Sequence, residues 1–220
     1  MVFDLDATLV DLGGFVNWRE AHKHAIERYN DCGCSEITKT CEGKGLFDTL
    51  NIIQAQLCNI NSSGEAERVQ DSVYAIIETY ESEGVNQCVL LPGCREALDW
   101  LRAEGIKIGL ATSNSQRVAE EVLELNGIRT YFTAVVGRSS KLRMKPHPDQ
   151  IISCFNKLGV DPKKGLVVGD SVRDVEAAKA AGAYAIAIPA RFTNMKALEE
   201  SGPNRIIKSL KELPNVISSL

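Results

Sequence analysis

The chain has 220 residues, of which 44% are hydrophobic and 25% are charged, and its formal net charge is -4. This composition is typical of a folded globular protein and excludes a disordered or collagen-like chain. The acidic balance argues against a general nucleic-acid binder, and no apolar run approaches the roughly 18–20 residues that cross a membrane. The first residues carry acids where a signal peptide needs positive charge, so we expect a cytoplasmic protein.

Seven cysteines are scattered along the chain, an odd number without regular spacing. This usage predicts reduced thiols in a cytoplasm rather than a disulfide framework. Cys32, Cys34 and Cys41 are close enough in sequence to be considered as a metal site. Structural zinc usually needs paired cysteines two residues apart and a fourth ligand, and neither is visible. We therefore expect ordinary thiols in the helical segment or in the core.

The first ten residues predict a strand followed by a turn, after which the pattern becomes helical. Apolar residues recur at helical spacing in three segments, and no convincing strand is found between residues 14 and 84. The three segments are NWREAHKHAIERY, GLFDTLNIIQAQLCNI and EAERVQDSVYAIIETYESEG. This stretch predicts an all-helical unit inserted between the first strand and the rest of the chain.

From residue 94 onward, predicted helices alternate with short apolar strands. The helices cover residues 94–105, 116–127, 148–159 and 172–183, and the strands cover 106–111, 132–137, 165–170, 184–189 and 205–209, before a last helix. Such alternation predicts a parallel sheet that helices cover on both faces. We expect an α/β protein with a Rossmann-like three-layer core, formed by residues 1–12 and 86–220. Residues 13–85 are expected to form an inserted all-helical cap.

Four short motifs accompany the predicted strands, and three of them stand at strand ends. They are Asp4-Leu5-Asp6-Ala7-Thr8, Thr112-Ser113-Asn114, Lys145-Pro146-His147-Pro148 and Gly169-Asp170-Ser171-Val172-Arg173-Asp174. In open parallel sheets, ligands bind beyond the carboxyl ends of the strands. We therefore expect the motifs to converge on one edge of the sheet. Each motif alone is a weak signal, and their joint occurrence is far more specific.

The residue types in these motifs suit a phosphate group and a metal ion. Asp4, Asp6 and Asp170 would form an oxygen-rich group suited to a hard divalent cation such as Mg²⁺. Without a cation these acids would repel one another and a phosphate dianion. Lys145 adds a fixed positive charge, and Thr112 with the backbone N–H groups after it can hold phosphoryl oxygens. One carboxylate can act as a nucleophile and another as acid and base.

The four motifs and their order resemble the haloacid dehalogenase superfamily, in the branch with a helical cap after the first motif. Phosphoglycolate phosphatases and β-phosphoglucomutases belong to this branch, and the resemblance covers essentially the whole chain. It implies a Mg²⁺-dependent phosphatase that hydrolyses a small phosphorylated metabolite through an aspartyl-phosphate intermediate. Asp6 favours phosphate-ester chemistry, because the dehalogenase and phosphonatase branches lack an acid there. We expect no nucleic-acid or membrane partner, and a monomer or a homodimer.

The resemblance also implies a role for each motif residue. Asp4 is the nucleophile and a metal ligand, while Asp6 is the acid and base and binds the metal through its carbonyl group. Asp170 is a further metal ligand. Lys145 neutralises charge on Asp4 and on the phosphoryl group, which Thr112 binds. The supporting residues are Thr8, Ser113, Asn114 and Asp174, the last orienting Lys145 or a metal-bound water.

Two features depart from the family pattern. Ala7 stands where the family usually has Gly, and we expect it to be tolerated unless the turn needs a positive φ. The chain starts three residues before Asp4, whereas family members have a longer first strand in the centre of the sheet. This short strand implies a mis-set start or a shortened edge, with some loss of stability.

Within the expected cap, residues 41–50 resemble the substrate-specificity loop of the family. Lys44, between two glycines, could reach an anionic substrate tail or be a solvated turn lysine. Trp18 and Arg19 follow the first linker and could face the cleft, although packing inside the cap is the alternative for Trp18. Arg173, in the fourth motif, could contact the substrate or form a surface ion pair.

Two other functions remain open from the sequence. A phosphosugar mutase of the β-phosphoglucomutase type shares the cap type, although Gly169-Asp170 followed by Asp174 looks more like the phosphatases. A non-catalytic binding module on the same scaffold would be expected to have lost at least one essential group, and none is lost. The identity of the substrate depends on cap side chains whose placement the sequence does not show.

Overall fold

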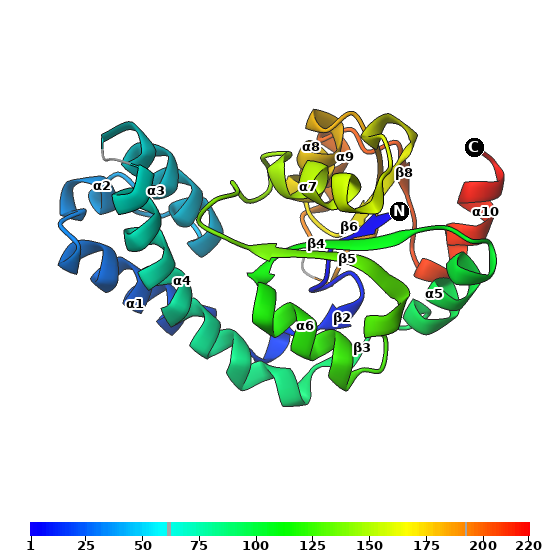
Figure 1. The fold of residues 1–220 in the computed structure, drawn as a ribbon, viewed down its shortest axis with the longest axis horizontal. Coiled ribbons are helices and arrows are strands. Elements are labelled where there is room, and N and C mark those ends of the chain that lie inside the picture. The colour runs from blue at the N-terminus through cyan, green and yellow to red at the C-terminus, as the bar shows by residue number, and fades with distance from the viewer. Residues whose placement is uncertain (61–62, 192) are drawn as a thin grey trace.

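The computed structural model describes residues 1–60, 63–191 and 193–220, so residues 61 and 62 of the expected cap lie outside it. Within these residues, six parallel strands form the central sheet in the order β5-β4-β1-β6-β7-β8 (Figure 1). Their bounds are β1 Val2–Phe3, β4 Ile108–Ser115, β5 Phe132–Arg138, β6 Leu166–Gly169, β7 Tyr184–Ala187 and β8 Arg205–Ile206. The expected parallel sheet is confirmed.

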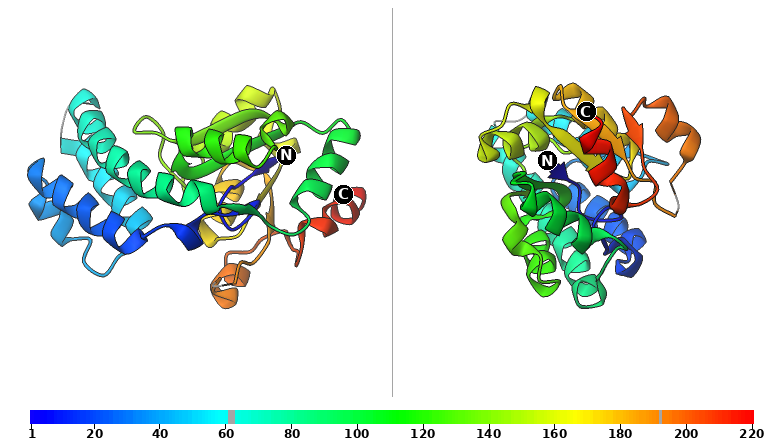
Figure 2. Two further views of the ribbon diagram at one scale, coloured as in Figure 1. Left: turned by 90° about the horizontal axis from the view of Figure 1, so that it is seen from below. Right: turned by 90° about the vertical axis from the view of Figure 1, so that its right-hand side faces the viewer.

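Helices cover both faces of this sheet, as the two views of Figure 2 also show. One face carries α7 (Asp149–Leu158), α8 (Val172–Ala180) and the short α9 (Met195–Glu200), and the other carries α5 (Cys94–Ala103), α6 (Gln116–Leu125) and α10 (Leu213–Ser218). The three layers agree with the sequence prediction. Helix α9 was not predicted, because its six residues are too few to show helical periodicity.

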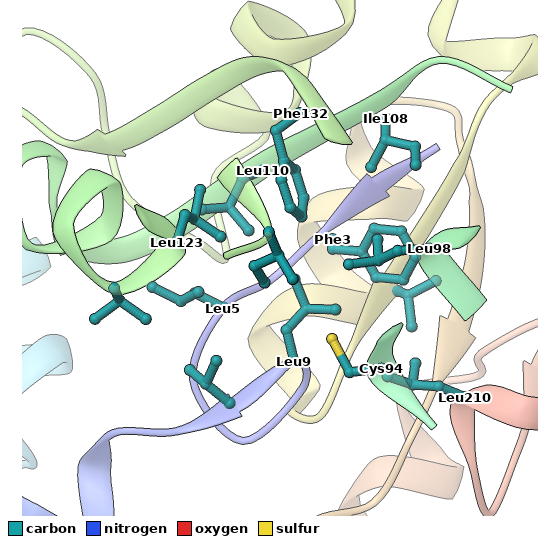
Figure 3. Packing of buried hydrophobic residues seen from close by; sticks show 14 of the residues in the cluster. Phe3, Leu5, Leu9, Cys94, Leu98, Ile108, Leu110, Leu123, Phe132 and Leu210 are labelled. Atoms are coloured by element: carbon teal, nitrogen blue, oxygen red, sulfur yellow. The ribbon is translucent and has the colours of Figure 1, made fainter. Parts of the chain in front are cut away.

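The first strand is very short but lies in the centre of the sheet. Val2 pairs with Gly109 on one side and Val167 on the other, so both neighbouring strands hold it. Its two side chains are fully buried on opposite faces. Val2 belongs to the apolar cluster under α7 and α8, and Phe3 belongs to the cluster that includes Leu98 and Leu110 (Figure 3). The central position expected for this strand is therefore observed.

Between β1 and β4 the chain leaves the sheet and forms an all-helical unit, called the cap below. It contains α1 (Trp18–Asp31), α2 (Ser35–Lys39), α3 (Leu46–Ile60) and α4 (Ser63–Gly84). The cap has its own apolar core, which includes Tyr29, Leu50, Ile53 and Ile77. Figure 1 shows the cap beside the carboxyl ends of the strands.

The two segments that connect the cap to the sheet pair with each other. β2 (Val10–Asp11) and β3 (Val89–Leu90) form a short antiparallel pair. This pairing was not predicted, because a strand of two residues has no readable alternation. It brings the entrance and the exit of the cap side by side.

The cysteines are free thiols, as expected. Cys34 and Cys41 are buried in the apolar core of the cap, and their Sγ atoms lie 3.8 and 3.7 Å from the carbonyl oxygens of Cys32 and Ile37. Among the described residues, no cysteines gather into a group that could hold a metal ion. In the same part of the chain, no helix combines the length and the apolar character that a membrane span requires.

Candidate active site

The four motifs meet in a cleft of about 140 Å³ beyond the ends of β1, β4 and β6. The residues singled out from the sequence that line it are Asp4, Asp6, Thr112, Ser113, Asn114, Lys145, Asp170, Arg173 and Asp174. Thr8 is not among them; it is fully buried, and its hydroxyl has no hydrogen-bond partner within the described residues. The expected convergence on one edge of the sheet is thus observed for the candidate site residues of the four motifs other than Thr8.

Lys145 lies between two carboxylates at the floor of the cleft. Its Nζ atom is 2.5 Å from Oδ1 of Asp4 and 2.5 Å from Oδ1 of Asp174, and its side chain is almost entirely buried. Burial alone would lower the pKa of Lys145, but the charges of Asp174 and Asp4 outweigh it and raise this pKa above its usual range. The amine therefore stays charged and supplies a fixed positive charge beside Asp4.

Asp174 is held at the first turn of α8 by a capping box. Its Oδ2 atom accepts hydrogen bonds from the backbone N–H of Ser171 at 3.1 Å and from the Ser171 hydroxyl at 2.5 Å. Gly169 makes this packing possible, since a Cβ atom there would lie 2.3 Å from Cγ of Asp174. Burial tends to raise the pKa of Asp174, but Lys145 and the Ser171 hydrogen bonds hold it below the usual range. Asp174 is thus an ionised partner that orients Lys145.

Asp4 and Asp170 carry negative charge that the protein itself does not fully offset. Oxygen atoms of Asp4, Asp170 and Asp174 lie within 4.8 Å of one another. Burial raises the pKa of Asp170 to about 8, with further increases from Asp174 and Asp4. Burial also raises the pKa of Asp4 to about 7, against the lowering effect of Lys145.

These carboxylates fit a hard divalent cation. Both oxygens of Asp174 already accept hydrogen bonds, from Lys145 and from Ser171, whereas Asp170 and Oδ2 of Asp4 keep free lone pairs. A cation between Asp4 and Asp170 would stabilise their charged forms, which burial and the neighbouring acids disfavour. Asp4 and Asp170 are therefore better placed as ligands than Asp174.

Asp6 is held by the linker that leads into the cap. Its Oδ1 atom accepts hydrogen bonds from the backbone N–H groups of Leu12 at 2.9 Å and Gly13 at 2.8 Å. Burial raises the pKa of Asp6, and the hydrogen bonds from Gly13 and Leu12 offset part of the increase. The same turn is tied to α1, because Nε1 of Trp18 donates to the Gly13 carbonyl at 3.1 Å. A Cβ atom at position 13 would lie 2.4 Å from Oδ2 of Asp6, so a larger residue there would displace this carboxylate.

Ala7 occupies the left-handed region of the backbone with φ of 58°, in the turn that joins Asp6 to Thr8. Ala was expected to be tolerated at this position unless the turn needs a positive φ, and the turn does need one. Its N–H donates to the carbonyl of Val10 at 2.7 Å, which closes the turn. Ala in this region carries strain that Gly does not.

Replacing Ala7 with Gly is expected to raise the free energy of unfolding by roughly 1 kcal/mol, because the strain of the left-handed backbone disappears. Urea denaturation measures the change. Ala103→Gly is the control at an exposed position near the end of helix α5, where the same substitution should lower stability by roughly 0.5–1 kcal/mol. A destabilised Ala7→Gly variant would contradict the assignment of strain to this turn.

The cap contributes Phe47 to the cleft, a residue that the sequence analysis did not single out. The Arg173 guanidinium lies over the Phe47 ring at 5.1 Å from its centroid and 3.6 Å from a carboxylate oxygen of Asp48. Trp18 packs edge-on against Phe47, with 5.5 Å between the ring centroids. Phe47 is the sole aromatic residue in the segment 41–50, and this was the signal available in the sequence.

The other cap residues considered from the sequence lie elsewhere. Lys44 and Arg19 are exposed and do not line the cleft, and Trp18 stands behind Phe47 rather than in the cleft wall. Their roles in substrate selection stay predictions. Arg173 forms the expected ion pair, with Asp48, and it also lines the cleft, while its contact with the substrate stays a prediction.

The cap rests directly on the loop that carries Lys145. Side-chain amides of α3 donate to this loop, from Asn51 to the Lys145 carbonyl at 3.1 Å and from Gln54 to the Ser140 carbonyl at 2.9 Å. Met144 is fully buried and belongs to the apolar core of the cap. The structure therefore shows the cap closed against the core.

Three buried polar residues near the motifs were missed by the sequence analysis. Gln150 donates to the carbonyl of Thr112 at 2.7 Å and to that of Gly137 at 3.0 Å. Glu81 from α4 and Arg138 from β5 form an ion pair whose two side chains are fully buried. Each stands among residues that look like an exposed helix face or a turn, so the sequence carries no signal for their burial.

This arrangement defines an α/β protein that gathers acids, a buried lysine and a threonine at the strand ends, under a helical cap. A family model described as haloacid dehalogenase-like hydrolase matches residues 1–188. The chain belongs to this family, as its motifs predicted.

Individual relatives agree with this assignment. The chain is 28% identical over 167 residues to the phosphoglycolate phosphatase of Nitrosococcus oceani, covering 76% of this chain and 74% of that protein. It is 26% identical over 217 residues to the phosphoglycolate phosphatase of Pseudomonas putida, covering 97% and 77%. A solved structure from Thermotoga maritima, provisionally named a β-phosphoglucomutase, covers 100% of this chain and 98% of its own, at 27% identity and a TM-score of 0.66. Family and relatives together show that the chain is a phosphatase.

Proposed function

We propose that this phosphatase is Mg²⁺-dependent and hydrolyses a small phosphorylated metabolite through an aspartyl-phosphate on Asp4. The observation that carries the proposal is the placement of Lys145 between Asp4 and Asp174, beside the uncompensated carboxylate of Asp170. Residues 1–12 and 86–220 are the core in this proposal, and residues 13–85 are the cap. Phosphoglycolate is the first candidate substrate, because it is the substrate named for the relatives.

The proposed reaction uses two carboxylates in turn. An oxygen of Asp4 attacks the phosphorus atom and the bond to the leaving oxygen breaks, while Lys145 offsets charge on Asp4 and on the transferring group. Asp6 gives its proton to the leaving oxygen and later takes one from the water that hydrolyses the aspartyl-phosphate. The linker amides hold Oδ1 of Asp6, so Oδ2 is the oxygen that carries this proton.

The phosphoryl oxygens are bound by the segment that ends β4. In the proposal the Thr112 hydroxyl turns its single proton from Oδ1 of Asn114 to a phosphoryl oxygen, and the backbone N–H of Ser113 also donates. Thr8 and Asn114 support the two loops. Asp4, Asp170 and the carbonyl group of Asp6 would hold Mg²⁺. The ion supplies positive charge that lets a phosphate dianion approach these acids.

Removal of the metal is expected to lower phosphate release by at least about 10²-fold, because the cleft then repels the substrate. The assay follows inorganic phosphate released from p-nitrophenyl phosphate, before and after treatment with EDTA. Readdition of Mg²⁺ in excess should restore the rate, and an intact melting transition in EDTA serves as the control for folding. Undiminished activity without divalent cations would refute the metal requirement.

The cap is proposed to select the organic part of the substrate. Phe47 gives the cleft an apolar wall, and Arg173 beside it supplies a positive charge suited to a second anionic group such as a carboxylate. The closed cap also excludes water from the reaction. A panel of phosphorylated metabolites ranked by kcat/KM identifies the substrate, with phosphoglycolate expected above neutral sugar phosphates of similar size.

A phosphosugar mutase is the second candidate, favoured by the likeness to the Thermotoga maritima structure. Incubation with β-glucose 1-phosphate separates the two functions. A mutase converts it to the 6-phosphate, whereas a phosphatase releases free glucose and inorganic phosphate.

A further inference from the structure

Glu81 and Arg138 form a fully buried, two-pronged ion pair between the cap and the sheet. Nη1 of Arg138 lies 2.8 Å from Oε1 of Glu81, and Nη2 lies 2.9 Å from Oε2. Neither side chain is exposed to solvent. Glu81 belongs to the last turn of α4, and Arg138 is the last residue of β5. Two distant parts of the chain thus meet directly behind the segment that ends β4.

One further hydrogen bond of this pair runs from Nη2 of Arg138 to the Tyr74 carbonyl in α4, at 3.4 Å, and the others go to residues of that segment. Nη1 of Arg138 donates to the carbonyl of Ser113 at 2.8 Å. The backbone N–H of Ser115 donates to Oε2 of Glu81 at 3.1 Å, and Nδ2 of Asn114 donates to Oε1 at 3.1 Å. The pair therefore holds three consecutive residues, one through its carbonyl, one through its side chain and one through its amide.

Asn114 passes this restraint to Thr112. The Thr112 hydroxyl donates to Oδ1 of Asn114 at 3.0 Å and accepts from the Asn114 backbone N–H at 3.1 Å. Both atoms that locate the Thr112 hydroxyl thus belong to a residue that Glu81 holds. Thr112 and Ser113 line the cleft, while neither Glu81 nor Arg138 does so.

Stability alone is a poor explanation for such a pair. Removing two charges from water is costly, and apolar side chains of similar volume often give an equally stable or more stable protein. Within the described residues, Nε of Arg138 is buried without a hydrogen-bond partner, so the pair is not even fully satisfied. What the pair does provide is a fixed direction for the Ser113 carbonyl and for the Asn114 amide.

We propose that Glu81 and Arg138 are positioning residues that set the phosphoryl-binding geometry of Thr112 and Ser113. This inference rests on the proposed function of that segment. Through Glu81 the cap helix α4 takes part in phosphate binding without touching the phosphate. Small displacements of the groups that bind the phosphate strongly lower the rate of phosphoryl transfer, because this catalysis depends on positioning and electrostatics.

The decisive variant is Glu81→Leu combined with Arg138→Met, which exchanges the ion pair for apolar side chains and releases the segment. We expect it to fold with a lowered melting temperature, because the Ser113 carbonyl, the Asn114 side-chain amide and the Ser115 N–H lose partners that apolar side chains cannot replace. Its inhibition constant for inorganic phosphate should rise by at least about tenfold, and kcat/KM for p-nitrophenyl phosphate should fall by at least about tenfold. Mg²⁺ affinity should change by less than about twofold, since the proposed metal ligands are on other strands.

Arg117→Met is the matched control. Arg117 joins α6 to the same part of α4 through an ion pair with Glu78 at 2.6 Å, near the surface. Within the part of the chain that the structure describes, it makes no hydrogen bond to the backbone of residues 112–115. Loss of this exposed link should leave the phosphate inhibition constant within about twofold of the original value. An equal effect of Arg117→Met would show that general cap attachment, rather than the buried pair, matters.

Two further results overturn the inference. The first is a folded double variant whose phosphate inhibition constant and kcat/KM match those of the unaltered protein. If the double variant does not fold, Glu81→Gln decides by the same two readouts. Gln keeps the shape of Glu but turns one acceptor into a donor, which then faces Arg138 together with either Asn114 or Ser115. The second is Glu81→Gln with unchanged values. Absence of phosphomonoester hydrolysis and phosphate binding by the unaltered protein would instead refute the proposed function itself.

Discussion

Asp4→Asn is expected to lower kcat by at least about 10³-fold while leaving the protein folded. An amide oxygen is a poor nucleophile, so the aspartyl-phosphate cannot form. The fold should persist because Asn has nearly the same shape and needs no charge compensation, and Lys145 keeps its ion pair with Asp174. Lys145 loses one partner, but the cost of burying a charged carboxylate at position 4, which raises the pKa of Asp4 to about 7, is also removed.

Phosphate release from p-nitrophenyl phosphate in the presence of Mg²⁺ measures the effect, with thermal unfolding as the check on folding. Asp31→Asn is the matched control, since Asp31 is exposed at the end of α1 and far from the cleft in sequence and fold. Activity of Asp4→Asn within about tenfold of the unaltered enzyme would rule out Asp4 as the nucleophile.

Lys145→Met should reduce both activity and stability. The substitution keeps the length and apolar stem of the side chain but leaves Asp4 and Asp174 buried without their shared cation. Breaking a buried ion pair on one side costs about 3–5 kcal/mol of unfolding free energy. The rate should fall by at least about 10²-fold, since the charge that offsets the phosphoryl group is lost.

Urea denaturation and kcat/KM for p-nitrophenyl phosphate report the two effects separately. Lys141→Met serves as the control, because Lys141 is an exposed lysine in the same loop and its loss should change stability by less than about 0.5 kcal/mol. If Lys145→Met were as stable as the control, the buried triad of charges would not be a source of stability.

Much of the core could be predicted because its elements carry local signals. The strand segments 132–137 and 165–170 are apolar along most of their length, and the helices before them end at glycines that adopt positive φ at Gly127 and Gly159. Elements without such signals were missed. The pair β2 and β3 exists only because the two cap linkers meet in space, and β4 continues through Thr112 to Ser115 rather than ending at residue 111.

The site shows the same division between local and tertiary information. The aspartates and Lys145 could be placed because they follow strands that end at one edge, so their convergence follows from the fold class. Glu81 and Arg138 could not be placed in this way. Their burial depends on a tertiary contact between α4 and the end of β5, which the neighbouring sequence does not indicate. Lys44 was considered because it is a charged residue between two glycines, but the residue of segment 41–50 that lines the cleft is Phe47.

Met144 shows that the helical insert is not an interchangeable module. Its backbone belongs to the loop of Lys145, yet its fully buried side chain fills the interior of α1–α4. In a chimaera that carried the helices of another family member, the cap core would be shaped for a different residue at position 144. If the Met144 side chain were then left exposed, the free energy of unfolding would fall by about 1.5–3 kcal/mol. Exchange of substrate range between relatives therefore requires residue 144 to be chosen together with the donor helices.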